Sequence, residues 1–213
     1  MRKVLISSNI WKNLIVHKTK KHKWINLRVL SPTQKLMTKK PFENFIKFLK
    51  ENVKEKVVSF DLSYVKFNSD PKTILSHILD SFPNLKELSI MHGRFYCNQT
   101  SFIREMPSYP SLEKLNISFL PKLFSDNDFE KLLISCLPNL EFLSMQKTYS
   151  KQYINFSNLK FLKFLDISFS ISSIDQRQVL PESLELVFAR SDSYTFNFGT
   201  NHILTQEFYV KLT

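Results

Sequence analysis

The fold is decided by Phe82-Pro-Asn-Leu-Lys-Glu-Leu-Ser-Ile90, which recurs as Tyr109-Pro-Ser-Leu-Glu-Lys-Leu-Asn-Ile117 and Leu137-Pro-Asn-Leu-Glu-Phe-Leu-Ser-Met145. Each copy holds an aromatic residue or leucine, a proline, a small polar residue and then L-x-x-L-x-φ, where φ is apolar. The L-x-x-L-x-φ pattern also begins, less perfectly, at residues 24, 57, 162 and 184. Near-copies that begin 22 to 33 residues apart indicate that the chain is built from internal repeats.

In each repeat, the last two apolar positions lie two residues apart, which is the period of a strand that buries one face. Apolar residues at helical spacing predict a helix over 42–53, a second after Asp70-Pro71, and a third that follows Ser125 and ends near Leu137. Repeats of 22 residues leave no room for a helix, so we expect the helices to thin out after about residue 150. One strand and its crossover cannot bury their apolar face alone, so the repeats must stack. The predicted fold class is α/β: a solenoid with a curved parallel sheet, helices on its convex side and shorter units toward the C-terminus.

The composition excludes several kinds of active site. The chain of 213 residues has only 2 glycines, whereas phosphate-binding loops and the G-x-S-x-G nucleophile motif need several within a few residues. The 5 histidines include no H-x-x-x-H pair and the 2 cysteines no C-x-x-C pair, so no zinc site is predicted. We therefore expect a protein that is not an enzyme and that needs no metal or cofactor.

The location of the protein is predicted from what the sequence lacks. No run of 18 apolar residues could span a membrane, and the N-terminal segment is too polar for a signal peptide. Two cysteines do not make a disulfide framework and fit a reducing compartment. We expect an intracellular protein, cytoplasmic or nuclear, that is not bound to a membrane and is monomeric outside a complex.

The charge is concentrated at the N-terminus. Residues 1–56 hold 15 Lys/Arg and 3 acidic residues, net +12, whereas residues 57–213 hold 15 and 16, net −1. The densest basic patch consists of Lys18, Lys20, Lys21 and Lys23. Two interpretations stay open: a solvated loop, or a patch that meets nucleic acid, an anionic membrane or an acidic protein.

The repeats resemble the leucine-rich repeat family over roughly residues 57–189. The proline lead-in and the spacing of 27 or 28 residues are similar to the helical subtype found behind F-box domains. The asparagine that follows L-x-x-L-x-L in that family is missing, because Gly93, Leu120 and Thr148 stand in its place. Cys136 matches the cysteine position of the subtype, displaced by one residue because Leu137 follows it, and we interpret it as a small buried apolar residue.

The segment before the repeats resembles the second half of an F-box, in which a helix carrying Trp-x-x-Leu is followed by another tryptophan. Trp11, Leu14 and Trp24 match that pattern, and the resemblance implies that they contact the adaptor of an SCF-type ubiquitin ligase. The first half of an F-box would lie before Met1. The alternative is that these residues only cap the end of the solenoid. The predicted organisation is therefore a basic cap or F-box-like remnant with the first repeat (1–56), repeats (57–189) and a C-terminal cap (190–213).

A binding site is predicted on the concave face of the sheet, where side chains alternate with the inward leucines. Outward aromatic residues on a polar sheet face are candidate anchors for a protein partner. The predicted face comprises Tyr64, Glu87, Met91, His92, Lys114, Asn116, Phe119, Phe142, Gln146, Phe164, Asp166 and Phe169. The expected function is a protein–protein interaction module, with substrate recognition for a cullin-based ligase as what the resemblance implies. The alternative is a basic nucleic-acid- or ribosome-associated protein that uses the lysine patch.

Overall fold

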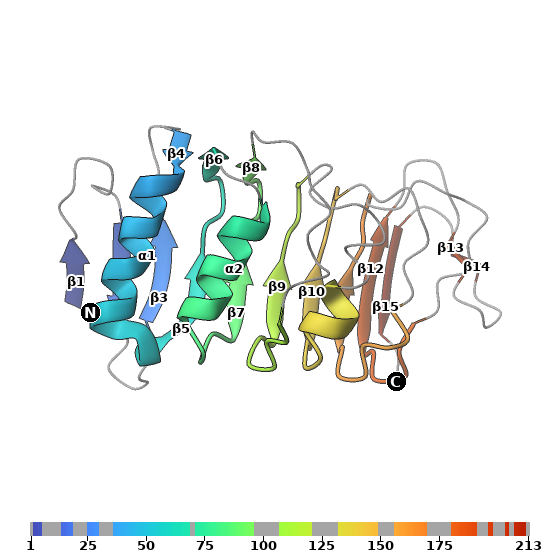
Figure 1. Ribbon diagram of the computed structural model, residues 1–213. Helices are drawn as coiled ribbons and strands as arrows, with labels where there is room; N and C mark the ends of the chain where they lie inside the picture. The colour runs from blue at the N-terminus through green and yellow to red at the C-terminus, as the bar shows by residue number, and fades with distance from the viewer. Residues whose placement is uncertain are drawn as a thin grey trace. The chain divides into compact units, whose positions relative to one another are not determined.

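A computed structural model describes residues 2–5, 14–18, 25–29, 36–68, 71–95, 107–120, 132–148, 156–169, 180–190, 196–197, 203–204 and 207–211. The chain divides into two compact units, Met1–Thr100 and Ser101–Thr213, called here the first and the second unit. Both units are built on parallel strands (Figure 1), and the fold is mixed α/β with few helices among the described residues.

The first unit has a main sheet and a smaller one. In the main sheet, β1 (Arg2–Leu5), β2 (Leu14–Lys18) and β3 (Ile25–Val29) pair antiparallel, and β3, β5 (Val57–Asp61) and β7 (Glu87–Ser89) pair parallel. In the smaller sheet, β4 (Leu36–Thr38), β6 (Lys66–Asn68) and β8 (Arg94–Phe95) are parallel. The parallel pairing predicted for the strands at 57 and 85 is therefore confirmed.

The N-terminal segment differs from the structure that the F-box resemblance implied. Leu14 is the first residue of strand β2 and does not lie in a helix. Strand β2 pairs antiparallel with β1 and β3. Lys18 ends the same strand. Trp11, Trp24 and the lysines at 20, 21 and 23 lie outside the described residues.

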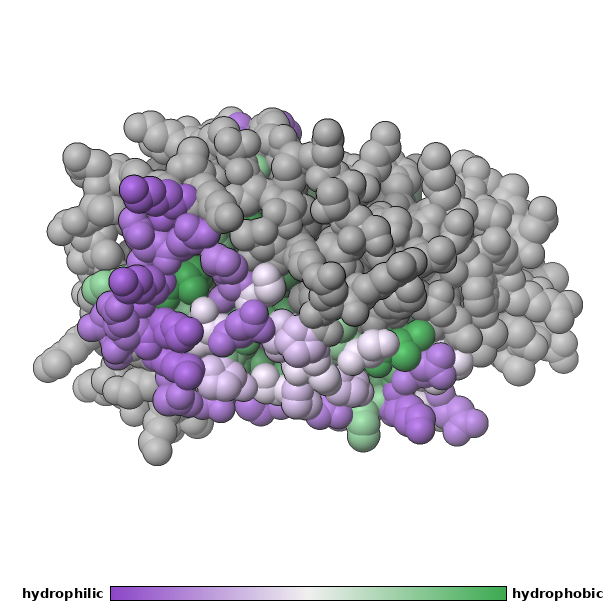
Figure 2. Space-filling view, in the orientation of Figure 1, coloured by the Kyte–Doolittle hydropathy of each residue, from purple (hydrophilic) through white to green (hydrophobic). Residues whose placement is uncertain are grey.

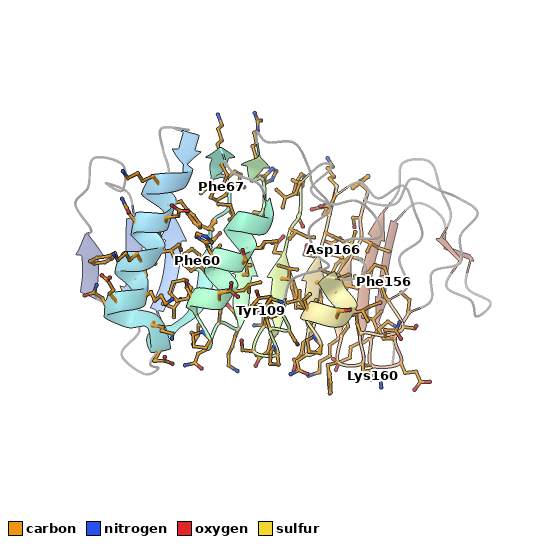
Figure 3. All side chains as sticks on the ribbon, in the orientation of Figure 1. Phe60, Phe67, Tyr109, Phe156, Lys160 and Asp166 are labelled. Carbon is orange, nitrogen blue, oxygen red and sulfur yellow. The ribbon has the colours of Figure 1, made fainter. Side chains whose placement is uncertain are left out.

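Two predicted helices are confirmed in the first unit and cover one face of its main sheet (Figure 1). They are α1 (Lys39–Val53), followed by a short 3₁₀ turn over Lys54–Lys56, and α2 (Pro71–Ser81). Phe45 of α1 meets Phe60 of β5 edge to face, with ring centroids 6.4 Å apart. Phe60 and Phe67 lie between the helices and the strands (Figure 3), while the outer surface of α1 is hydrophilic (Figure 2). The apolar stripe of each helix is thus buried against the sheet, as amphipathic spacing requires.

The second unit contains the later repeats. β9 (Lys114–Asn116), β10 (Phe142–Ser144), β11 (Phe164–Asp166) and β12 (Leu186–Arg190) pair parallel, and β15 (Glu207–Lys211) pairs antiparallel with β12. β13 (Phe196–Asn197) and β14 (Ile203–Leu204) form a separate antiparallel pair. The register aligns one inward residue from each parallel strand, and all four are almost fully buried: Leu115, Leu143, Leu165 and Val187.

The structure describes only the C-terminal part of the third predicted helix. Only Leu132–Cys136 is helical there, as one π-helical turn, and residues 121–131 lie outside the described part of the chain. Cys136 is buried, as predicted, and its backbone carbonyl accepts a hydrogen bond from the Tyr109 amide at 2.6 Å. Beyond residue 150, the connections that the structure describes over 156–163 and 181–185 are turns.

The proline lead-in of each repeat is a β-turn that ends two residues before the strand begins. The amide of Leu85 donates to the Phe82 carbonyl at 3.0 Å, and Leu112 and Leu140 repeat this bond to Tyr109 and Leu137. Proline suits the second position of such a turn because its φ is already near −65°. The small polar residue then links repeats, since the Asn139 amide side chain donates to the Pro110 carbonyl at 2.9 Å. The Asn84 side chain likewise donates to the Glu55 carbonyl at 3.1 Å. These asparagines precede their strands, whereas the asparagine of the leucine-rich repeat pattern, which this chain lacks, would follow them.

Candidate functional site: the outward strand faces

The outward side chains of the parallel strands form two faces that we name by their composition. In each strand, the residues on either side of the inward leucine or phenylalanine lie on the opposite side of the sheet. The polar face of the first unit consists of Ser59, Asp61, Ser63, Glu87 and Ser89. The aromatic face of the second unit consists of Lys114, Asn116, Phe142, Ser144, Phe164, Asp166, Leu186 and Phe188.

Three phenylalanine rings run across the aromatic face. Phe142 and Phe164 are direct cross-strand partners, and their rings stack with centroids 4.2 Å apart and planes 6° from parallel. Phe188 lies against Phe164 at 5.1 Å, tilted by 44°. All three rings are half-buried, so each keeps surface open to solvent. A pre-packed row of aromatic rings offers contact area at little cost in side-chain entropy.

Charged side chains border this row at both ends of the strands. Glu113, Glu141 and Glu185 each immediately precede a parallel strand, and Lys163 occupies the same position before β11. The Lys163 ammonium donates to the Glu141 carboxylate at 3.0 Å. This hydrogen bond, and then the charges of the three glutamates, hold the pKa of Lys163 above the ordinary lysine value. The edge therefore carries three carboxylates against one ammonium group.

At the other end of the strands, Asp166 lies on the aromatic face between two rings (Figure 3 labels it). Phe164 is two residues earlier on the same face, and Phe188 is the direct cross-strand partner of Asp166. The opposite cross-strand neighbour is Ser144, whose side chain is short. Asp166 Oδ1 accepts a hydrogen bond from the Ser168 amide at 3.0 Å, which holds the carboxylate in place.

A row of residues with positive φ follows the strands in both units. We call Tyr64, His92, Phe119, Lys147 and Phe169 the turn row; their φ values lie between 53° and 68°. The left-handed region costs a non-glycine residue about 1–2 kcal/mol. Backbone bonds between repeats hold this conformation, because the Tyr64 amide donates to the Met91 carbonyl at 2.8 Å and Lys147 to Ser168 at 2.9 Å. Strain that persists only because its surroundings impose it is typical of functional positions.

The side chains of the turn row contact one another within each unit. In the second unit, the Lys147 ammonium lies over the rings of both Phe119, at 5.5 Å, and Phe169, at 5.3 Å. In the first unit, the rings of Tyr64 and His92 stack at 4.8 Å, with planes 10° apart. Tyr64 is 58% exposed, which makes it the most open large apolar side chain among the described residues.

The predicted face residues differ in exposure and in their contacts. Glu87, Met91 and Gln146 are half-buried and line the ends of the strands, whereas Lys114 is exposed at the β9 end of the aromatic face. Asn116 accepts a hydrogen bond from the Ser118 amide at 3.0 Å, as Asp166 does from Ser168. The remaining predicted residues lie in the aromatic row or the turn row described above.

Sequence reasoning missed two residues of these rows, Phe188 and Lys147. Phe188 falls inside the imperfect repeat at 184, where the outward position could have been read from the register alone. Lys147 occupies the position of Tyr64 and Phe119 in its repeat, but the search for outward aromatic residues passed over a lysine. Thr148 stands where the leucine-rich repeat pattern has an asparagine, and its buried hydroxyl links two repeats by donating to the Ile117 carbonyl at 2.7 Å.

The described residues contain no group of three side chains placed to hold a metal ion. None of the described helices combines the length and the hydrophobicity that a membrane span needs. Burial raises the pKa of the Cys136 thiol, which keeps it protonated and weakly nucleophilic. Comparisons of the chain with protein-family models, curated proteins and solved structures find no match.

Proposed function

We propose that the protein is a leucine-rich-repeat interaction module that binds another protein on the outward strand face of its second unit. The observation that carries this proposal is the row of half-buried rings of Phe142, Phe164 and Phe188 on the outward face of the sheet. The opposite face of the same sheet is covered by the leucines of the core. Large aromatic residues grouped on a polar surface are the usual anchors of protein–protein contacts.

The repeat assignment within each unit rests on register. Parallel pairing places the second leucine of one L-x-x-L-x-φ pattern beside that of the next, as for Leu115, Leu143 and Leu165. The lead-in turns recur with the same spacing as the pattern, and Asn84 and Asn139 each link their repeat to the preceding one. From this run of repeats we infer a solenoid, in which each repeat is stabilised by its neighbours.

The test is affinity purification of the full chain as wild type and as the double variant Phe142→Ala/Phe164→Ala. The matched control is Phe48→Ala/Phe161→Ala, which removes two exposed phenylalanines, 42% and 54% exposed, that lie outside the parallel strands. We expect the partner to be lost at least tenfold from the first variant and retained by the control. Equal recovery from both variants would contradict the proposal, provided that both keep the thermal transition of the wild type.

Recovery at moderate and high salt separates the two functions predicted from the sequence. A ligase adaptor and cullin that stay bound in high salt would support substrate recognition for a ubiquitin ligase. RNA that is recovered at moderate salt and lost at high salt would support the alternative role of Lys18, Lys20, Lys21 and Lys23, because counterion release makes such binding salt-dependent.

A further inference from the structure

We propose that the first unit binds single-stranded nucleic acid, with a base stacked on the Tyr64 ring and the adjacent phosphates contacted by Lys66 and Arg94. The site does not depend on the protein-binding surface proposed for the second unit. It is defined by the juxtaposition of two stacked rings, Tyr64 and His92, with two paired cations, in a unit of high positive charge.

The Tyr64 ring has one covered face and one open face. His92 stacks on the covered face, with ring centroids 4.8 Å apart and planes 10° from parallel. Tyr64 is nevertheless 58% exposed, which a ring covered on both faces could not be. By contrast, Phe119 and Phe169 of the second unit, which share the Lys147 ammonium, are half-buried. A flat base can therefore extend the Tyr64–His92 stack by one layer, because every base has a face that stacks on an aromatic ring.

Two cations follow the stacked rings in the sequence and pair across the smaller sheet. Tyr64 and His92 lie in the connections that lead from the main sheet to the smaller one (Figure 1). Two residues further on, β6 begins with Lys66 and β8 with Arg94, which are direct cross-strand partners. The next residue of β6, Phe67, is buried, so Lys66 lies on the solvent side of the smaller sheet, and Arg94 is exposed. Rings that stack bases, combined with cations that contact phosphates, are how proteins bind single strands without reading their sequence.

The charge of the first unit favours a polyanion over a basic segment of a protein. The unit carries a net charge of +12, all of it from residues 1–56, because the remainder of the unit has four basic and four acidic residues. The outward positions of its main sheet include two carboxylates, Asp61 and Glu87. Arg28 is the cross-strand partner of Asp61, and Lys3 shares the outward face through the pairing of β1, β2 and β3. With the two cations of the smaller sheet, these positions hold four cations and two carboxylates, so phosphates meet a net positive charge.

The experiment measures the binding of a fluorescein-labelled ten-nucleotide uridine oligomer to the full chain by anisotropy. The matched ligand is an oligomer of abasic sugars with the same number of phosphates, which keeps the charge and removes the bases. Tyr64→Leu removes the ring, Tyr64→Phe retains it, and Arg94→Gln removes one charge. The control variant is Phe161→Leu, which removes a ring of the second unit that is 54% exposed. All variants are compared with the wild type at several salt concentrations, once their thermal transitions are shown to match it.

We expect Tyr64→Leu to weaken binding of the uridine oligomer about tenfold and to leave binding of the abasic oligomer unchanged, because only stacking is lost. Tyr64→Phe should restore the affinity, and Phe161→Leu should bind both ligands as the wild type does. Arg94→Gln should weaken both ligands and reduce the slope of log K against log salt by about 0.7 for the lost phosphate contact, a slope that Tyr64→Leu should not change.

Equal binding of the uridine oligomer by Tyr64→Leu and the wild type would overturn the proposal, as would the absence of binding by the wild type. If Tyr64→Leu loses a captured protein while its binding of the oligomer is unchanged, the surface is a protein site and the nucleic-acid assignment is wrong. The proposed function is tested separately by Phe142→Ala/Phe164→Ala in the second unit, so either result can fail while the other stands.

Discussion

Asp61 in the first unit and Asp166 in the second occupy the same position of their repeats and accept the same backbone hydrogen bond, at 2.9 and 3.0 Å. Their surroundings differ. Asp61 shares its face with serines and Glu87, and the Ser63 and Ser89 hydroxyls bond to each other at 2.9 Å. Asp166 lies between Phe164 and Phe188. One backbone arrangement thus supports a polar face in one unit and an aromatic face in the other, because the outward side chains are not needed for the core.

The largest effect is expected from the feature that the two units share. Replacing Leu88 or Leu143 with alanine removes an inward side chain that is 2% or 0% exposed, and each change should lower the free energy of unfolding by about 3 kcal/mol. Urea unfolding followed by circular dichroism measures this. A loss below about 1 kcal/mol for Leu143→Ala would mean that the inward side chains of the second unit are not part of a packed core. The two units would then not bury their inward faces in the same way.

A smaller loss is expected where the second unit has a hydrogen bond that the matching residue of the first unit cannot make. Thr148→Val keeps the shape of the side chain but removes the hydroxyl that donates to the Ile117 carbonyl, whereas Gly93 holds the equivalent position in the first unit. Because the bond is buried, we expect a loss of about 1–2 kcal/mol in urea unfolding. Thr148→Ser retains the donor and should behave nearly as the wild type.

The cation between two rings distinguishes the turn row of the second unit from the Tyr64–His92 stack of the first. Lys147→Met keeps the length and the backbone conformation but loses the charge over Phe119 and Phe169. We expect a loss of about 0.5–1 kcal/mol in thermal unfolding. Lys160→Met, at an exposed turn position, is the control and should leave the melting temperature unchanged.

The smallest effect is expected at the exposed ion pair of Lys163 and Glu141, at the strand edge of the second unit. Lys163→Met should lower the melting temperature slightly at low salt and not at all in high salt, because exposed pairs are screened. The pKa of Lys163 is raised in the folded protein, so the contribution of this pair is complete below the ordinary value of 10.5 and is lost as the pH rises through the raised pKa. A salt-independent loss would show that packing, not charge, is responsible.

Sequence periodicity predicted the inward rows and the helices α1 and α2, because burial of one face leaves a period that can be read directly. The buried residues of α1 and the leucines of β9, β10 and β11 follow that period. The helix implied for Leu14 was wrong, since a short tryptophan pattern carries no information on whether neighbouring strands will pair with it. Four residues of the turn row were predicted only as outward side chains and Lys147 was missed, because none of these residue types favours a positive φ on its own.

By itself, the sequence determined which residues of the repeats face inward, where the repeated strands lie and how the lead-in turns form, because these depend on local spacing and on proline. Only the tertiary structure decided that Phe142 stacks on Phe164, that Lys147 lies between two rings and that Asp166 faces Phe188. These contacts join residues about 22 to 28 positions apart, and they exist only when neighbouring strands pair in one register.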